Sequence, residues 1–174
     1  MKVAEPESTV QSGWAKAVLV GRDPERTAIR IVVLVALVFL FVKFIFVPIR
    51  VQGVSMLPTY SEDGVNFVNR IAYALHSPRR YDVVAIRTTG MSIMYMKRII
   101  ALPGEEIEFR GGHTFINGRE LPEPYLRKPC YWNLPPRILG PDEYYVVGDN
   151  RSMAAEDHTK GVAKRDRIVG KVLL

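Results

Sequence analysis

An apolar stretch near the start of the chain limits the possible folds more than any other feature. Residues 31–47 read IVVLVALVFLFVKFIFV, with one charge at Lys43. As a helix, this stretch spans roughly 25 Å, close to the roughly 30 Å hydrocarbon thickness of a bilayer. It is apolar on every face, whereas a helix on a soluble core needs one apolar face. The sequence therefore predicts a membrane-spanning helix at residues 28–48, after a polar tail at residues 1–27.

A cleaved secretory signal is the main alternative for this stretch. Such a signal has a short basic start and a small-residue cleavage site, but here residues 1–30 are mostly polar and PIRVQG follows the run. Basic residues are more frequent before the run than after it. They are Lys16, Arg22, Arg26 and Arg30 on one side, and Lys43 and Arg50 on the other. The positive-inside rule then predicts a cytoplasmic N-terminus, with the residues after about 48 outside.

Composition limits the partners. The 174 residues include 24 Lys and Arg against 18 Asp and Glu, and a net charge of +6 favours anionic lipid or nucleic acid. We expect no nucleic-acid partner, because helix-turn-helix, zinc-finger and aromatic RNA-binding signatures are missing from the sequence. The single cysteine, Cys130, cannot form an intrachain disulfide and so does not indicate the redox compartment.

Residues 49–174 differ from the apolar run in the pattern of their apolar and polar residues. Short runs of β-branched and aromatic residues, such as YDVVAIR and EYYVVGD, alternate with the turn signals PGE, GG and NG. This pattern is typical of an all-β domain. The Asn117-Gly118 pair predicts a hairpin turn. The proline-rich stretch LPEPYLRKPCYWNLPPRILGP predicts a loop-rich β subdomain at about residues 104–140.

Lys97 lies in the strand-like run IMYMKRIIA. Because side chains alternate along a strand, Arg98 is expected on the opposite face. The residues expected on the same face as Lys97 are Ile93, Tyr95, Ile99 and Ala101. Lys97 is then either an edge-strand lysine that reaches water, or a desolvated lysine whose pKa falls from about 10.4 toward neutrality. The strand pattern alone does not choose between these interpretations.

A serine needs a neighbouring base before its hydroxyl becomes a good nucleophile. The three histidines, His76, His113 and His158, leave a Ser-His-Asp triad open in principle. A Ser-Lys dyad needs fewer partners, provided that the lysine is neutral.

Five blocks of the sequence resemble a known family. In order and approximate spacing, GVSMLPT, RRYDVVAIR, YMKRIIALPGEEIEF, FINGREL and YYVVGDNR are similar to blocks of the type I signal peptidases. These are the membrane-bound serine proteases that remove signal peptides from exported bacterial proteins. The resemblance covers about residues 30–174. It implies their mainly β catalytic fold, shared with the self-cleaving repressors of the bacterial DNA-damage response, although a membrane segment here stands where such repressors bind DNA.

The resemblance also implies roles for particular residues. Ser55 is the expected nucleophile and Lys97 the general base, while the backbone N–H of Ser55 helps to stabilise the oxyanion. Met56 is expected in the pocket for the residue before the scissile bond. At Gly53, some family members carry a serine thought to donate a second oxyanion hydrogen bond, and others carry glycine as here.

The block GDNRSMAAEDHTKG departs from the family pattern. Aligned from Gly148 to Gly161, Ala154 replaces a serine that contacts the lysine, so either Ser152 supplies that hydroxyl or none is needed. Glu156-Asp157-His158 replaces an Asp-Ser-Arg triplet. Two interpretations stay open: Glu156 and His158 pair in support of the dyad, or His158 is a solvated loop residue with no effect on it. The remaining scaffold residues expected around the dyad are Asp149, Asn150 and Arg151.

Together these observations predict a signal peptidase that cuts after small residues, anchored in the bacterial cytoplasmic membrane with its catalytic domain outside. Its expected partners are signal peptides of exported preproteins and membrane lipid. We expect no metal or organic cofactor, because the dyad supplies both nucleophile and base. Two alternatives stay open: a catalytically silent β domain that binds exported chains, and a peptidase dedicated to one pilin or secreted substrate. The sequence makes no prediction of oligomeric state.

Overall fold

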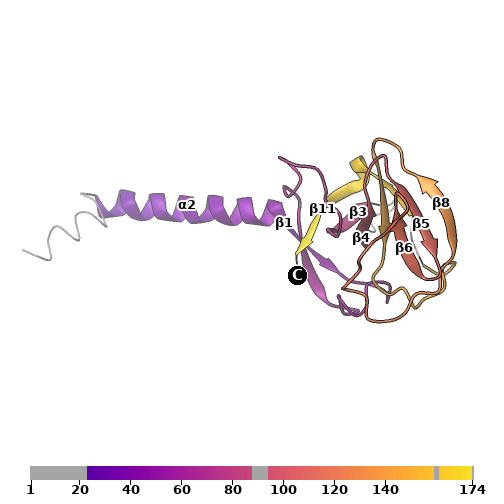
Figure 1. The fold of residues 1–174 in the computed structure, drawn as a ribbon. Coiled ribbons are helices and arrows are strands. Elements are labelled where there is room, and N and C mark those ends of the chain that lie inside the picture. Colours follow the sequence, from indigo (N-terminus) through magenta and orange to yellow (C-terminus); the bar gives the residue numbers. More distant parts are fainter. Residues whose placement is uncertain (1–22, 88–93, 159–160, 174) are drawn as a thin grey trace, which may run out of the picture. The chain divides into compact units, whose positions relative to one another are not determined.

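The protein is described here by a computed structural model of residues 23–87, 94–158 and 161–173 (Figure 1). The chain divides into two compact units, residues 1–44 and residues 45–174. The first contains a long helix, and the second contains the strands.

Helix α2 runs from Pro24 to Ile45. Proline suits the first turn because the missing N–H has no helical acceptor there, and Glu25 complements the positive end of the helix. The 21 residues from Glu25 to Ile45 are long and apolar enough to cross a membrane, since they span roughly 30 Å. The crossing itself stays a prediction.

The helix bounds differ from the predicted 28–48 at both ends. It begins four residues earlier, at Pro24, and residues 46–48 belong to a strand rather than the helix. Pro48 explains the C-terminal difference, because a proline cannot donate to the helical ladder and disfavours helical geometry in the residue before it.

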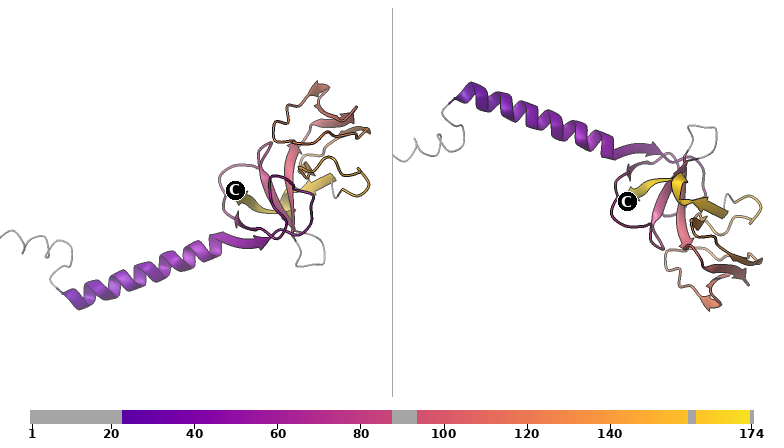
Figure 2. Two further views of the ribbon diagram at one scale, coloured as in Figure 1. Left: turned by 90° about the horizontal axis from the view of Figure 1, so that it is seen from below. Right: turned by 90° about the horizontal axis from the view of Figure 1, so that it is seen from above.

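Within the described residues, seven strands form one antiparallel sheet in the order β1-β2-β11-β3-β4-β9-β10. Figure 2 shows the strands from two further sides. Half of the neighbouring pairs, β2-β11, β11-β3 and β4-β9, are distant in sequence. A 3-10 turn, Arg165–Arg167, leads into the last strand. The strands are β1 Phe46–Arg50, β2 Val65–Asn69, β3 Val83–Arg87, β4 Met94–Ala101, β9 Glu143–Val147, β10 Gly161–Lys164 and β11 Ile168–Leu173. The predicted mainly β fold is therefore confirmed.

A second antiparallel sheet has the order β7-β6-β5-β8 and falls within residues 104–140. Its strands are β5 Glu106–Arg110, β6 His113–Ile116, β7 Arg119–Glu120 and β8 Leu134–Ile138. Asn117 and Gly118 join β6 to β7 with φ values of 51° and 74°, the positive values that a type I′ turn requires. The predicted hairpin is confirmed. Pro135 and Pro136 lie in edge strand β8, where a missing donor is tolerated.

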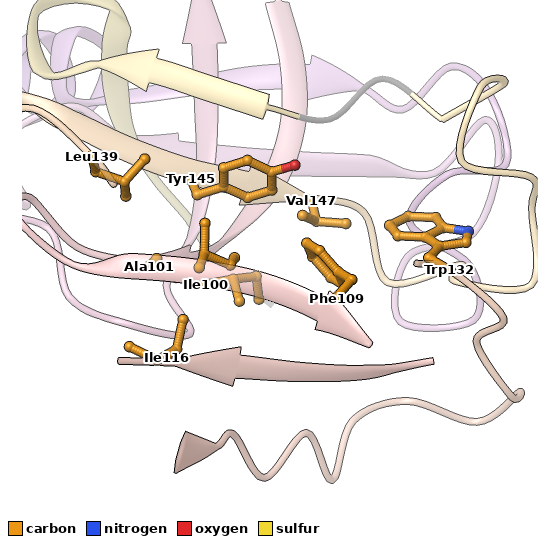
Figure 3. Packing of buried hydrophobic residues seen from close by; sticks show 9 residues of the cluster. Ile100, Ala101, Phe109, Ile116, Trp132, Leu139, Tyr145 and Val147 are labelled. Carbon is orange, nitrogen blue, oxygen red and sulfur yellow. The ribbon is translucent and has the colours of Figure 1, made fainter. Parts of the chain in front are cut away.

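One core cluster joins the two sheets (Figure 3). Ile100, Tyr145 and Val147 of the large sheet pack against side chains from the region of the small sheet, and the Phe109 and Trp132 rings meet edge to face at 5.5 Å. A separate cluster fixes the segment after β1, because Met56 and Tyr60 are buried there among side chains of the large sheet. Those partners include Val68, Val83, Ala85 and Met96.

Strand β4 follows the predicted alternation only in part. Lys97 lies opposite Val84, and Tyr95 lies opposite Ile86 on β3. Between Ile99 and Ala101 the register with β9 shifts, and Ala101 packs with Ile100 in the same cluster. The expected common face of Lys97 and Ala101 is therefore wrong, because a β-bulge interrupts the period of two. Ile93 lies outside the described residues.

Candidate active site

Ser55 lies in the connection between β1 and β2. The start of this connection is held by two backbone hydrogen bonds, from the Val51 N–H to Gly64 O and from the Asp63 N–H to Val51 O, both 2.9 Å. Next to the serine, the buried Met56 side chain anchors the segment in the core. The serine is therefore presented by a segment fixed on both sides.

Lys97 reaches Ser55 from strand β4. Its Nζ lies 2.6 Å from Ser55 Oγ, and the residue is only 3% exposed. Burial lowers the pKa of Lys97 to about 8, an effect that the carboxylate of Asp149 partly opposes. A large share of the lysine is therefore neutral near pH 8, and a neutral amine can accept the serine proton. An edge-strand lysine reaching water does not fit this burial.

The histidines do not form an alternative site at Ser55. His76 and His113 are exposed, with ring contacts to Ser77 O and to the Glu120 carboxylate. His158 is buried edge to face against Trp132, with ring centroids 5.0 Å apart. No histidine hydrogen-bonds Ser55 Oγ in the part of the chain that the structure describes.

A groove of about 400 Å³ adjoins the Ser55–Lys97 pair. Strand β1 with the segment after it contributes one part of the lining, and β4 contributes the other. Its lining residues are Pro48, Ile49, Arg50, Val51, Gln52, Gly53, Ser55, Met56, Met94, Tyr95, Met96 and Lys97. The three methionines make part of the wall apolar, and a nucleophile and a base open onto it. Such an arrangement suits acyl transfer on an extended chain.

Gly53 lines the groove in a backbone conformation that favours glycine. Its φ is 86°, and no atom lies within 4 Å of where a Cβ would stand. Space is therefore available, but a serine would occupy the left-handed region at a cost of roughly 1–2 kcal/mol. The second oxyanion donor that some family members carry is unfavourable at this position.

Asp149 links the nucleophile segment to the lysine strand. Its carboxylate accepts a hydrogen bond from Thr59 Oγ1 at 2.6 Å and two from the Arg98 guanidinium, from Nε at 2.8 Å and Nη2 at 2.5 Å. Arg98 also donates to Tyr81 O and lies 4.1 Å from the centre of the Tyr125 ring. Arg98, which follows Lys97 in strand β4, and Thr59, which lies in the same connection as Ser55, thus bind the same carboxylate.

Asn150 and Arg151, the two residues after Asp149, also form hydrogen bonds close to the Ser55–Lys97 pair. The Asn150 N–H donates to Ser55 O at 2.9 Å. Arg151 is buried, donating from Nε to Gly148 O at 3.0 Å and from Nη2 to Glu123 Oε1 at 2.6 Å. These contacts are what a scaffold around the pair requires.

The altered block is arranged differently from our prediction. Glu156 is exposed whereas His158 is 3% exposed, and within residues 23–87, 94–158 and 161–173 no ion pair joins them. The pairing is therefore not formed, and a solvated loop position does not fit the burial of His158 either. The turn at 152–158 directs His158 inward against Gly148 and Trp132, while Glu156 faces solvent.

The hydroxyl of Ser152 does not take the place of the serine missing at Ala154. Ser152 Oγ donates to Asn150 Oδ1 at 2.8 Å, and Ala154 is exposed. Among the described ranges, the one side-chain hydrogen bond of Lys97 Nζ goes to Ser55 Oγ.

The sequence did not predict three residues that hydrogen-bond the scaffold around the Ser55–Lys97 pair: Thr59, Arg98 and Glu123. Arg98 offered a signal, since a basic residue beside Lys97 in a mostly buried strand needs a carboxylate partner. Thr59 and Glu123 offered none, because their partners lie 90 and 28 residues away in the chain.

Comparison with known proteins shows the family of the chain. Residues 25–174 match the protein family described as "Signal peptidase, peptidase S26". The chain belongs to this family of serine peptidases. The match includes the Ser55 segment, the Lys97 strand and the Asp149 turn.

Several curated signal peptidases are similar to the chain. Signal peptidase I of Leptolyngbya laminosa is 32% identical over 128 residues, covering 69% of this chain and 63% of that protein. Signal peptidase I P of Bacillus subtilis subsp. natto is 35% identical over 151 residues, covering 80% and 81%. Signal peptidase I T of Bacillus subtilis strain 168 is 31% identical over 180 residues, covering 97% and 86%. A crystal structure of an Enterococcus faecalis signal peptidase I has 26% identity and a TM-score of 0.44, and the match covers 56% of this chain and 97% of that one.

Proposed function

We propose that the protein is a membrane-anchored signal peptidase that cleaves exported preproteins with Ser55 as nucleophile and Lys97 as general base. The observation that carries the proposal is the 2.6 Å approach of a buried lysine Nζ to a serine Oγ. Burial keeps a large share of the lysine neutral near pH 8, as a general base must be. Ser55 and Lys97 both being present in this geometry disfavours a silent binding domain.

In the proposed reaction, neutral Lys97 takes the Ser55 proton as Oγ attacks the carbonyl carbon of the scissile peptide bond. The Ser55 N–H donates to the oxyanion that forms, and the Lys97 ammonium then gives its proton to the leaving amine. Water attacks the resulting ester of Ser55 after losing a proton to Lys97. The Lys97 proton returns to Oγ as the new carboxyl group departs, which restores the enzyme.

The lining of the groove gives a physical reason for selectivity at the residue before the scissile bond. Met56 is buried beside Ser55, and Met94 and Met96 line the same groove, so we propose that this apolar part of the wall bounds the space for the side chain before the scissile bond. We propose that it accepts small residues of the A-x-A-like segment that follows the apolar part of a signal peptide. A large residue at that place is expected to clash with this wall.

The test of the proposed activity is cleavage of several unrelated preproteins by the purified protein in detergent, with Ser55→Ala as the paired inactive variant. We expect mature chains of the correct length from each preprotein with wild type only. Cleavage of just one preprotein would indicate a dedicated peptidase, and equal cleavage by Ser55→Ala would rule out the proposed nucleophile.

We also propose that α2 crosses the bacterial cytoplasmic membrane, with the tail inside and the strand-rich unit outside, because the helix is long enough and basic residues favour its N-terminal side. Protease added outside cells with an opened outer barrier should digest the region beyond about residue 50 and spare the tail. Digestion of the tail alone would reverse the orientation and make signal-peptide cleavage outside the membrane untenable.

A further inference from the structure

We infer that Asn150 is a positioning residue for the oxyanion donor and that Ser152 holds its side-chain amide in place. The inference rests on the proposed function, in which the backbone N–H of Ser55 stabilises the oxyanion. It concerns the contacts that Asn150 makes with the peptide groups next to Ser55.

Asn150 holds the peptide groups on both sides of Ser55. Its Nδ2 donates to Val54 O at 3.1 Å, and its backbone N–H donates to Ser55 O at 2.9 Å. Gly148 packs closely behind the second contact, since a Cβ on this glycine would lie 2.2 Å from Ser55 O. The turn after β9 therefore packs directly against the Ser55 backbone and hydrogen-bonds it.

The contact with Val54 O acts on the Ser55 N–H through a single peptide group. That group is planar and trans, so its oxygen and its N–H point in opposite directions. A donor that fixes the oxygen therefore fixes the direction of the N–H, and it also polarises the N–H into a stronger donor. The Leu57 N–H supplies a second donor to the same oxygen at 3.2 Å.

The Ser55 N–H is not used within the described structure. Across the described ranges, no protein acceptor takes a hydrogen bond from it. Gly53 carries no side chain that could add a second donor, so the direction of this N–H matters more here than in a site with two donors.

Val54 O determines which way the Asn150 amide faces, and Ser152 restrains the amide in that orientation. Val54 O can only accept, so the NH2 group must face it, and the amide oxygen then faces Ser152. The Ser152 hydroxyl donates to this oxygen at 2.8 Å, which limits movement of the amide. Because Ser152 is exposed, it can be changed with little effect on the core.

The first test is Asn150→Ala. Complete loss of an oxyanion donor lowers kcat by about 10²–10³-fold, and a misdirected donor should lose less, so we expect a fall in kcat of about 10-fold. KM should stay within about twofold, and the pH midpoint of activity should not move, because the Lys97–Ser55 contact is untouched. A fall accompanied by a shifted midpoint, or a rise in KM alone, would overturn the inference.

The second test uses Ser152 and stays informative if Asn150→Ala unfolds. Ser152→Ala should lower kcat about 2- to 5-fold, and Ser152→Thr, which keeps a hydroxyl, should lose less. In the Asn150→Ala background, Ser152→Ala should have no further effect, because Ser152 acts through Asn150. Unchanged kcat in Ser152→Ala, or independent effects in the double variant, would contradict the inference.

The outcomes separate this inference from the proposed function. If wild type cleaves preproteins, Ser55→Ala does not, and the Asn150 and Ser152 variants match wild type, only the inference fails. If wild type does not cleave, the proposed function fails and the inference fails with it.

Discussion

Replacing either Ser55 or Lys97 by alanine is expected to lower preprotein cleavage by at least about 10³-fold. The serine supplies the attacking oxygen, and the lysine is the only side chain that hydrogen-bonds this oxygen in the described structure. Lys97→Arg should fail as well, because arginine stays protonated at any workable pH. The measurement is single-turnover cleavage of one preprotein, with circular dichroism to show that each variant is folded.

Matched substitutions away from the pair serve as controls for these variants. Ser61→Ala changes an exposed serine of the same connection, and Lys164→Arg changes an exposed lysine on strand β10. Both should cleave at the wild-type rate. Substantial cleavage by Lys97→Ala, with the controls unchanged, would show that another group acts as the base.

Asp149→Asn is expected to lower the free energy of unfolding by about 3–5 kcal/mol, because it leaves the Arg98 guanidinium without its anionic partner. The Asp149 side chain is fully buried and that of Arg98 is 11% exposed, so water cannot replace the carboxylate well. The same change loosens the link between Thr59 and the lysine strand, and we expect kcat to fall about 10²-fold in the folded fraction. Denaturant unfolding and single-turnover rates measure the two effects separately.

Glu108→Gln is the matched control for Asp149→Asn. It also replaces a carboxylate by an amide in an arginine pair, but its partner Arg110 is 61% exposed and lies 3.6 Å away. We expect at most about 1 kcal/mol and no change in rate. Equal losses in the two variants would show that the Asp149–Arg98 link has no special role in the site.

Local patterns in the sequence were enough to predict the apolar helix, the mainly β class and the Asn117-Gly118 hairpin. Each depends on residues adjacent in the chain: the continuous apolar run, the short β-branched runs and one turn dipeptide. The pairing of Ser55 with Lys97, 42 residues apart, was expected only from a family resemblance.

Long-range pairing set the features that the sequence did not predict. Strand β11 pairs with β2 and β3, about 100 and 85 residues earlier in the chain, and no local signal specifies these neighbours. The bulge after Ile99 depends on how β9 meets β4. His158 turns inward because a space exists between Gly148 and Trp132, which only the folded core creates.

The titration of Lys97 tests the central claim, that a buried and partly neutral lysine is the base for Ser55. The measurement is kcat/KM for one preprotein against pH, which reports the pKa of the essential base in the free enzyme. Activity must rise with pH, because the base works only after losing its proton. We predict a rising limb with a midpoint at about 8. A midpoint near 10.5, the ordinary value for lysine, or a profile without a rising limb in this range, would contradict the claim.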